Sequence, residues 1–392
     1  MKVLHITASN KGGAGIAALR LHKALVNSGV QSAYLSRNIT IDFQDKIIED
    51  SFFKYKKVNI VQRIQKKLDA LLNFSKLNKA QSRLNAVKNK LEYEIYSLPF
   101  SNSKLHEHPL VQEADILNFH WMGGILDFES FFKNCKKPIV WTLHDLNPIQ
   151  GIFHYQNDVI YNQKYIGIEE EKLSKYKFEV LNNSTLKAFV SPSNWLLNEV
   201  NKKKFNSNIL KQTIPNCIDF ENFHIQEKTA IKTKYGISTE EFVVLFVADS
   251  LKNKRKGFDL MLEALEYLQN ISLTIVTIGK GTIDLNSQKV VALGEIHDVE
   301  KMAEIYALAD VFVLPSREDN LPNVMLEAFA CGTPVISFNH GGMKDYIINN
   351  ETGILVEDIS GKKLAEGIQQ FYSTRKSYDS QFIAKFAKDN FS

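Results

Sequence analysis

Short apolar runs alternate with helix-like segments along this chain, and the whole series occurs twice. In the first half, the runs "KVLHIT", "ADILNFHW", "KPIVWTLHD" and "LKAFVSPS" end in small, polar or histidine residues. After "QTIPNCIDF" the series resumes with "FVVLFVAD" and continues to "TPVISF". Strands separated by helical segments are typical of a parallel sheet with crossover helices. The sequence therefore predicts an α/β protein with two doubly wound halves.

The length agrees with two domains, because 392 residues exceed a single typical core. We place an N-terminal domain at residues 1–218 and a C-terminal domain at residues 219–380, joined near residues 215–222. A last helix at 381–392 could return to the first domain. Parallel sheets bind ligands at the carboxyl ends of their strands, so we expect a cleft between the two halves.

The composition is that of an ordinary globular protein, with 44% hydrophobic and 23% charged residues. A net charge of +4 does not indicate nucleic-acid binding. Cys135, Cys217 and Cys331 lie far apart without CxxC spacing, which argues against a disulfide framework or a zinc site. The first apolar run is too short for a signal sequence, and no run is long enough to span a membrane. We therefore expect a cytoplasmic protein.

A glycine-rich turn, Gly12, Gly13 and Gly15, follows the first strand and precedes a helical pattern. Its glycines do not form GxGxxG, and the next strand ends in Arg37 rather than an acid, so a nicotinamide site is not indicated. The free amides and dipole of a helix start favour an anion. A plain tight turn between strand and helix is an equally open interpretation.

Glu327 lies among apolar neighbours in "NVMLEAFA", where an ionised carboxylate is costly unless it is paired. Pro322 suits the first turn of a helix and Gly332 its C-terminal cap, so we predict a helix over residues 322–331. Asp319 then lies in the loop before that helix. The carboxylate of Glu327 should bind either a ligand or a buried Lys or Arg.

The second half carries a family resemblance in "FVADSLKNKRKGFDLMLEAL", "IGKG", "LGEIHDVEKMAEIYALADVFVLPSREDNLPNVMLEAFACGTPVISF" and "TGILV". These motifs resemble the GT-B glycosyltransferases of family 4. With "GGAG", "NFHW" and "WTLHD", the chain is most similar to the colanic-acid and capsule-type members. The resemblance covers nearly the whole chain. It implies two Rossmann-like domains facing each other across a cleft, and a retaining enzyme that uses a nucleotide sugar.

The resemblance also implies a donor site around two acids separated by seven residues, here Asp319 and Glu327. By this resemblance, Glu327 corresponds to the acid that binds the ribose hydroxyls, and we expect Asp319 to be a ligand of the donor sugar. The segment from Asn320 through Leu321 and Pro322 to Asn323 is expected to turn its amides toward the sugar and the diphosphate.

Positive charge for a leaving diphosphate is expected in "KNKRKG", after the first strand of the second half. Arg255 and Lys256 are the candidates, and Lys256 precedes Gly257 as the family motif requires. Asp249 stands where the family commonly has Arg, so the chain departs from the pattern there. The alternative is a solvated basic loop.

His144 of "WTLHD" ends a strand and resembles the histidine that contacts the donor sugar. His120 of "NFHW" is a second candidate, and Asp145 is expected to orient the imidazole or cap the next segment. A histidine that only packs in the core is the alternative for each. The chain contains no DxD pattern, so we expect no cofactor and no metal, with the acceptor attacking on the face that the diphosphate leaves.

Residues 54–90, within an insertion at about 51–97, are rich in Lys and Arg interleaved with apolar residues at helical spacing. Such a helix suits either an anionic membrane surface or a surface helix pair packed on its own domain.

Taken with the resemblance, these features predict a retaining glycosyltransferase that moves a hexose-type sugar from a nucleotide sugar to a glycan or lipid-linked acceptor in surface polysaccharide synthesis. We expect it in the cytoplasm, with peripheral contact to the inner face of the cell membrane and no nucleic-acid partner. A sugar-nucleotide epimerase and a catalytically silent glycan-binding protein are the alternatives.

Overall fold

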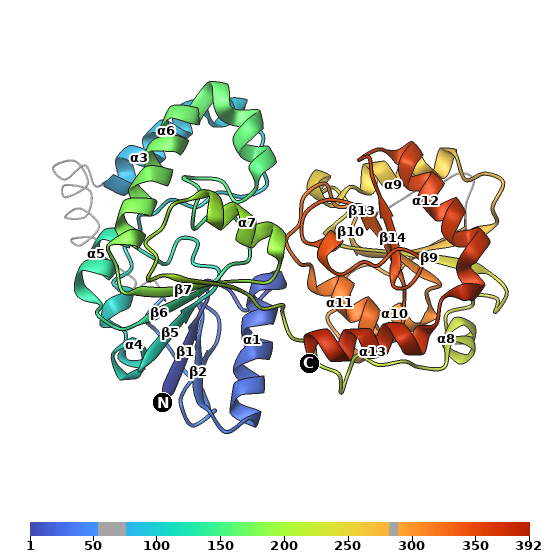
Figure 1. The fold of residues 1–392 in the computed structure, drawn as a ribbon, viewed down its shortest axis with the longest axis horizontal. Helices are drawn as coiled ribbons and strands as arrows, with labels where there is room; N and C mark the ends of the chain where they lie inside the picture. Colours follow the sequence, from blue (N-terminus) through green and yellow to red (C-terminus); the bar gives the residue numbers. More distant parts are fainter. Residues whose placement is uncertain (54–75, 282–288) are drawn as a thin grey trace, which may run out of the picture. The chain divides into compact units, whose positions relative to one another are not determined.

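The computed structural model describes residues 1–53, 76–281 and 289–392. The chain divides into two compact units, Met1–Ile214 and Pro215–Ser392. The division falls a few residues before position 218, where we placed the end of the first domain. Each unit is built around its own sheet (Figure 1).

The first unit contains a sheet in the order β4-β3-β2-β1-β5-β6-β7-β8. Its parallel strands are β1 (Lys2–Ile6), β2 (Gln31–Leu35), β5 (Ile116–Phe119), β6 (Ile139–Thr142), β7 (Leu186–Ser191) and β8 (Leu210–Thr213). Two short antiparallel strands, β3 (Thr40–Ile41) and β4 (Ile47–Ile48), extend one edge. The sequence pattern predicted β1, β2, β5, β6 and β7, but neither β8 nor this edge.

The helices of the first unit connect these strands. Among the described residues these are α1 (Gly12–Asn27), α3 (Lys76–Val87), α4 (Pro109–Glu113), α5 (Phe128–Asn134), α6 (Gln156–Asn182) and α7 (Asn194–Lys202). The glycine-rich turn forms the first turn of α1, which begins at Gly12 and so includes these glycines rather than following them. Gly15 passes so close to the chain before it that a Cβ there would lie 2.3 Å from the carbonyl oxygen of Ser9.

Helix α3 shows where part of the basic segment lies. Its Ala80 and Leu84 are buried in a cluster that includes Ile166 and Leu173 of α6. Arg83 forms an ion pair with Glu169 of α6 at 2.8 Å. This part of the segment therefore packs on its own unit, as one of the two interpretations expected. Residues 54–75, the rest of the basic stretch up to α3, lie outside the described residues.

The second unit contains a wholly parallel sheet in the order β11-β10-β9-β12-β13-β14. The strands are β9 (Phe242–Ser250), β10 (Leu273–Lys280), β11 (Lys289–Ala292), β12 (Val311–Leu314), β13 (Val335–Phe338) and β14 (Gly353–Val356). The central strands β12 and β13 are buried along their whole length, as expected of a sheet covered on both faces.

The helices of the second unit are α8 (Lys228–Lys234), α9 (Phe258–Glu266), α10 (Val299–Leu308), α11 (Asn323–Ala330), α12 (Gly361–Thr374) and α13 (Ser380–Phe391). Helices α8, α10, α11 and α13 share one apolar core, and α9 and α12 share another on the opposite face of the sheet (Figure 1). Helix α13 packs on α11, and the amide of Ile218 donates to the carbonyl of Phe391 at 2.9 Å. The last helix is thus part of the second unit.

The predicted architecture, an α/β chain with two doubly wound parallel sheets, is confirmed. The observed helix α11 differs from the predicted range of 322–331 by one residue at each end. Gly332 adopts the left-handed conformation with φ of 75° directly after the cap residue, as predicted for the end of this helix.

Candidate functional site

The basic loop after β9 is folded inward rather than spread into solvent. Residues Lys254–Lys256 form a single 3-10 turn, and Gly257 follows with φ of 72°. A Cβ on Gly257 would lie 1.9 Å from the carbonyl oxygen of Pro315, so only glycine fits this crossing. The side chains of Arg255 and Lys256 are only 12% and 17% exposed. The structure therefore contradicts the solvated-loop interpretation for these two bases.

Both bases bind one carboxylate, that of Asp319. Lys256 Nζ donates to Asp319 Oδ2 at 2.6 Å, and Arg255 Nη1 donates to the same oxygen at 3.1 Å. Arg255 Nη1 also donates to the carbonyl of Glu318 at 2.9 Å. Burial acts to raise the pKa of Asp319, but the charges of Lys256 and Arg255 lower it overall. We call these three side chains the Asp319 cluster, in which two cations share one anion.

Glycines allow the loop of Asp319 to lie against its neighbours. The amide of Gly342 donates to the carbonyl of Asp319 at 3.1 Å. A Cβ on Gly341, whose φ is 64°, would lie 2.2 Å from that carbonyl oxygen. Gly341 and Gly342 of the "NHGG" segment thus pack against the backbone of Asp319 and hold it in place.

Glu327 lies in α11 and is 7% exposed. The hydroxyl of Tyr306, in α10, donates to its Oε2 at 2.9 Å. The hydroxyl of Tyr306 is therefore one partner of this carboxylate. Burial and the nearby Glu327 carboxylate raise the pKa of the Cys331 thiol, so Cys331 is a packing residue.

The predicted donor-binding segment at Asn320, Leu321 and Asn323 is buried at the start of α11. Asn216 Nδ2 donates to Asn323 Oδ1 at 3.1 Å and to the carbonyl of Leu321 at 3.5 Å. Sequence reasoning missed Asn216, which follows the proline that starts the second unit.

Asp249, at the position where the family commonly has Arg, is exposed at the end of β9. The bases that bind Asp319, Arg255 and Lys256, lie further along the chain, in the 3-10 turn after β9.

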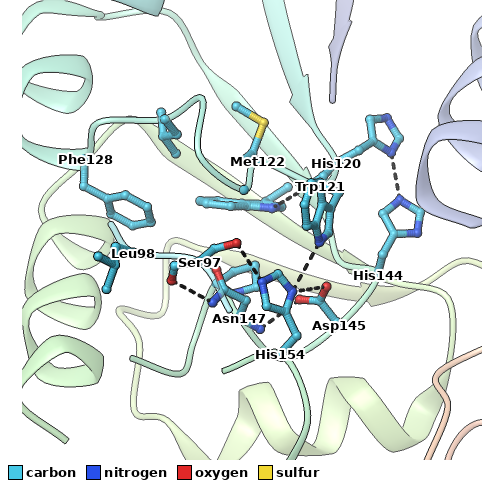
Figure 2. A pocket seen from close by; sticks show the side chains of 14 residues that line it. Ser97, Leu98, His120, Trp121, Met122, Phe128, His144, Asp145, Asn147 and His154 are labelled. Atoms are coloured by element: carbon cyan, nitrogen blue, oxygen red, sulfur yellow. Dashed lines mark hydrogen bonds and ion pairs between the residues drawn. The ribbon is translucent and has the colours of Figure 1, made fainter. Parts of the chain in front are cut away.

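In the first unit, His120 and His144 follow the adjacent strands β5 and β6. His120 Nδ1 lies 3.0 Å from His144 Nε2, and the rings are stacked with centroids 5.3 Å apart (Figure 2). His120 Nε2 lies 3.1 Å from Nδ1 of His5 in β1. The two predicted histidines are thus brought together, with His5 as a third member that sequence reasoning missed.

Burial keeps these rings uncharged. It lowers the pKa of His144 to about 4 and that of His5 to about 3, and His5 and His144 also lower the pKa of His120. All three imidazoles are therefore neutral near pH 7.

Asp145 binds His154, and its Oδ1 accepts from the amide of Asn147 at 2.9 Å, so it caps the following segment, one of the two roles expected of it. Asp145 Oδ2 lies 2.6 Å from His154 Nδ1, and His154 Nε2 lies 2.8 Å from Ser97 Oγ (Figure 2). Burial acts to raise the pKa of Asp145, but His154 and the amide of Asn147 lower it overall.

The side chains of Ser97, His154 and Asp145 follow one another in the order of an activated nucleophile. The cavity beside Ser97 measures only about 20 Å³, which is room for one water molecule. A substrate does not fit there, so we assign these three side chains to holding the loop in place.

The loop from Leu143 to Tyr155 carries both His144 and His154, and buried groups of α6 hold it. Glu170 Oε2 accepts from the amide of Ile152 at 2.7 Å, and its carboxylate also binds the amide of Gly151. Lys177 Nζ donates to the carbonyl of Asn147 at 2.7 Å. Burial lowers the pKa of Lys177 to about 7, although Glu170 and Asp145 oppose this. The loop geometry is therefore fixed by charges that the sequence pattern did not single out.

No metal-binding group of three or more His, Cys, Asp or Glu residues occurs among residues 1–53, 76–281 and 289–392. Within the same ranges, no helix has the length and apolar character needed to cross a membrane.

Comparison with protein families relates the second unit to known enzymes. Residues 241–374 match the family described as Glycosyl transferases group 1. N-acetyl-alpha-D-glucosaminyl L-malate synthase of Bacillus anthracis is 29% identical over 173 residues, which cover 42% of this chain and 45% of that protein. Alpha-galactosylglucosyldiacylglycerol synthase of Streptococcus pneumoniae is 34% identical over 137 residues, covering 31% of this chain and 36% of that protein. The matches thus span less than half the length of these curated relatives.

Solved structures resemble the whole chain. Sucrose-phosphate synthase from Thermosynechococcus elongatus has a TM-score of 0.68 at 17% identity, covering 100% of this chain and 95% of that one. HepE of Anabaena, solved with UDP and glucose, has a TM-score of 0.62 at 15% identity, covering 100% and 96%. These likenesses show the fold, which is GT-B.

Proposed function

We propose, from the group 1 glycosyl transferase match at residues 241–374 and the GT-B fold of the chain, that this protein is a retaining glycosyltransferase using a nucleotide-sugar donor. The observation that carries the proposal is the Asp319 cluster. Arg255 and Lys256 are held by one carboxylate, so the cluster keeps an excess positive charge. A diphosphate that gains negative charge as the glycosidic bond breaks is stabilised by such fixed cations.

Glu327 is proposed to bind the ribose of the donor. Tyr306 holds one carboxylate oxygen at 2.9 Å and so fixes the orientation of the group. A carboxylate accepts more than one hydrogen bond, which suits the two vicinal hydroxyls of a ribose as donors. That HepE was solved with UDP-glucose supports a nucleotide sugar as the donor class.

His144 is proposed to contact the donor sugar. Its neutral ring can donate one hydrogen bond to a hydroxyl oxygen without attracting the diphosphate. Asp319 has a second proposed role as a ligand of a sugar hydroxyl. The oxygen proposed for this contact is Oδ1, which accepts from the amide of Asn320 at 3.2 Å, whereas both bases bind Oδ2.

The proposed reaction proceeds on the front face of the sugar. The bond between the anomeric carbon and the diphosphate oxygen breaks, and the acceptor oxygen bonds to that carbon on the same face. The acceptor proton passes to the departing phosphate oxygen, so the anomeric configuration is retained. Helix termini, Arg255 and Lys256 are proposed to supply the electrostatic stabilisation without a metal.

The proposed acceptor is a glycan or a lipid-linked oligosaccharide in surface polysaccharide synthesis, in the cytoplasm. The similarity to a synthase whose name specifies a diacylglycerol product supports a lipid-linked acceptor. Peripheral contact with an anionic membrane stays a proposal for the basic segment 54–90, of which residues 54–75 lie outside the described residues and α3 buries its apolar face on its own unit.

The proposal is tested by incubating the protein with UDP-, GDP- and ADP-sugars, with and without a lipid-linked or oligosaccharide acceptor. Acceptor-dependent release of nucleoside diphosphate, with an α-linked product from an α-linked donor, is expected. Donor conversion without acceptor would indicate an epimerase, and binding without any turnover would indicate a silent glycan-binding protein.

A further inference from the structure

Three imidazoles form a row across the first sheet. His5 belongs to β1, His120 follows β5 and His144 follows β6, three neighbouring strands in the sheet. His5 Nδ1 lies 3.1 Å from His120 Nε2, and His120 Nδ1 lies 3.0 Å from His144 Nε2. His5 and His120 are 1% and 2% exposed. Both nitrogens of His120 therefore face another imidazole inside the protein.

Asn118 fixes the proton at one end of this row. Its Nδ2 lies 3.3 Å from the carbonyl oxygen of Val140 and 3.0 Å from Thr142 Oγ1. A carbonyl only accepts, so the NH2 group must face Val140 and the amide oxygen must face the other way. That oxygen lies 3.1 Å from His5 Nδ1. Because an amide oxygen also only accepts, His5 must carry its proton on Nδ1.

The position of this proton determines the next two. Each ring is neutral near pH 7 and so has one N–H. The Nδ1–H of His5 is also directed at His120 Nε2. That nitrogen must therefore be unprotonated and accept the hydrogen bond, so the proton of His120 lies on Nδ1. That N–H is directed at His144 Nε2, so the proton of His144 lies on Nδ1. The opposite arrangement would set a bare His5 Nδ1 against the Asn118 oxygen, two acceptors at 3.1 Å.

Other titratable groups beside the row leave this order intact. His22 of α1 meets the ring of His5 edge-on at 6.2 Å, but its Nδ1 binds Ser32 Oγ at 2.8 Å. Asp145, next to His144 in the chain, directs its carboxylate to His154 at 2.6 Å. Neither group lies between the nitrogens that join the three rings.

We propose that Asn118, His5 and His120 are positioning residues that hold His144 as the neutral Nδ1–H tautomer. This inference rests on the proposed function, in which His144 contacts the donor sugar. The row fixes both the ring orientation and the nitrogen that donates, so His144 offers an uncharged N–H to a sugar oxygen rather than a bare nitrogen or a cation. None of the three positioning residues needs to touch the substrate.

The test is the nitrogen-15 NMR spectrum of the histidine rings at pH 7 in the full-length wild-type protein, which needs no substrate. His144 is expected to be protonated at Nδ1 and bare at Nε2. Finding the proton of His144 on Nε2 would overturn the proposal without any variant. If no nucleotide sugar is turned over, the proposed function fails, whereas this spectrum still decides the tautomer.

Two substitutions separate positioning from packing. His120→Leu removes the donor and should leave His144 a mixture of tautomers, whereas His120→Asn places an amide near the position of Nδ1 and should restore Nδ1–H. With an active donor, kcat should fall about tenfold in His120→Leu, which corresponds to about 1.4 kcal/mol, and recover in His120→Asn, with nucleotide affinity unchanged in both. His297→Gln, at an exposed position in the second unit, is the control. An unchanged His144 tautomer in a folded His120→Leu protein would contradict the proposal, and His5→Phe repeats the test if that variant does not fold.

Discussion

Lys256 Nζ donates a 2.6 Å hydrogen bond to Asp319 Oδ2, and this ion pair sets the charge of the proposed donor site. Arg255 shares the same oxygen at 3.1 Å, so the site contains one more cation than anion among these groups. This excess positive charge is the basis of the proposal that the two bases stabilise the donor diphosphate.

Asp319→Asn should affect stability and nucleotide binding in opposite directions. Without the carboxylate, two largely buried cations repel each other, and the free energy of unfolding should fall by about 3 kcal/mol. A nucleoside diphosphate replaces the missing negative charge, so UDP or GDP should raise the melting temperature of the variant more than that of the wild type. Thermal unfolding with and without nucleotide measures both effects. Equal shifts in the two proteins would show that the diphosphate binds elsewhere.

Tyr306→Phe removes a single hydroxyl, the one that binds Glu327. We expect a loss of about 1 to 2 kcal/mol in the free energy of unfolding and weaker nucleotide binding, because the carboxylate is no longer held in place. Glu327→Ala should abolish nucleotide binding in a protein that still folds.

Tyr235→Phe is the matched control, since the Tyr235 hydroxyl donates at 3.2 Å to a different carboxylate of the same unit, that of Glu304. Calorimetric titration with nucleotide is the measurement. If Tyr235→Phe weakened nucleotide binding as much as Tyr306→Phe, the assignment of Glu327 to the ribose would be wrong.

Lys177 should make stability rise with pH. Its pKa is about 7 in the folded protein and near 10.5 in the unfolded chain, so between these values the unfolded state binds more protons. The free energy of unfolding then increases with pH over this window. In Lys177→Met this increase between pH 7 and 9 should disappear. Denaturant titrations at several pH values give the slope, with Lys172→Met, an exposed position in the same helix, expected to behave like the wild type.

The fold was predictable because its signals are local. The apolar runs "FVVLFVAD" and "DVFVLPS" are buried on both faces of the second sheet, and such strands are recognisable without knowledge of their neighbours. The basic loop and the acid of "EDNLPN" were also recognisable, and the structure brings Arg255, Lys256 and Asp319 together.

The partners of the site residues were not predictable, because they come from distant strands and helices. In the sequence His5 is a single polar residue within an apolar strand, with no motif around it. It comes to lie beside His120 because β1 and β5 are neighbours in the sheet. Tyr306 is one aromatic residue in a helix, and only the contact between α10 and α11 brings it to Glu327. The pairing of Asp145 with His154 depends on how the loop turns back on α6.

The most direct test of the account is the release of nucleoside diphosphate from the donor in the presence of EDTA, by the wild type, Lys256→Ala and Lys252→Ala. Lys252 is an exposed base in the same loop and serves as the control. We predict that the wild type and Lys252→Ala retain activity in EDTA, whereas Lys256→Ala loses about 2 to 4 kcal/mol of transition-state stabilisation, as removal of one preorganised group typically costs. If EDTA stopped turnover and added Mg²⁺ or Mn²⁺ restored it, or if Lys256→Ala kept near-normal activity, the Asp319 cluster would not be what stabilises the leaving diphosphate.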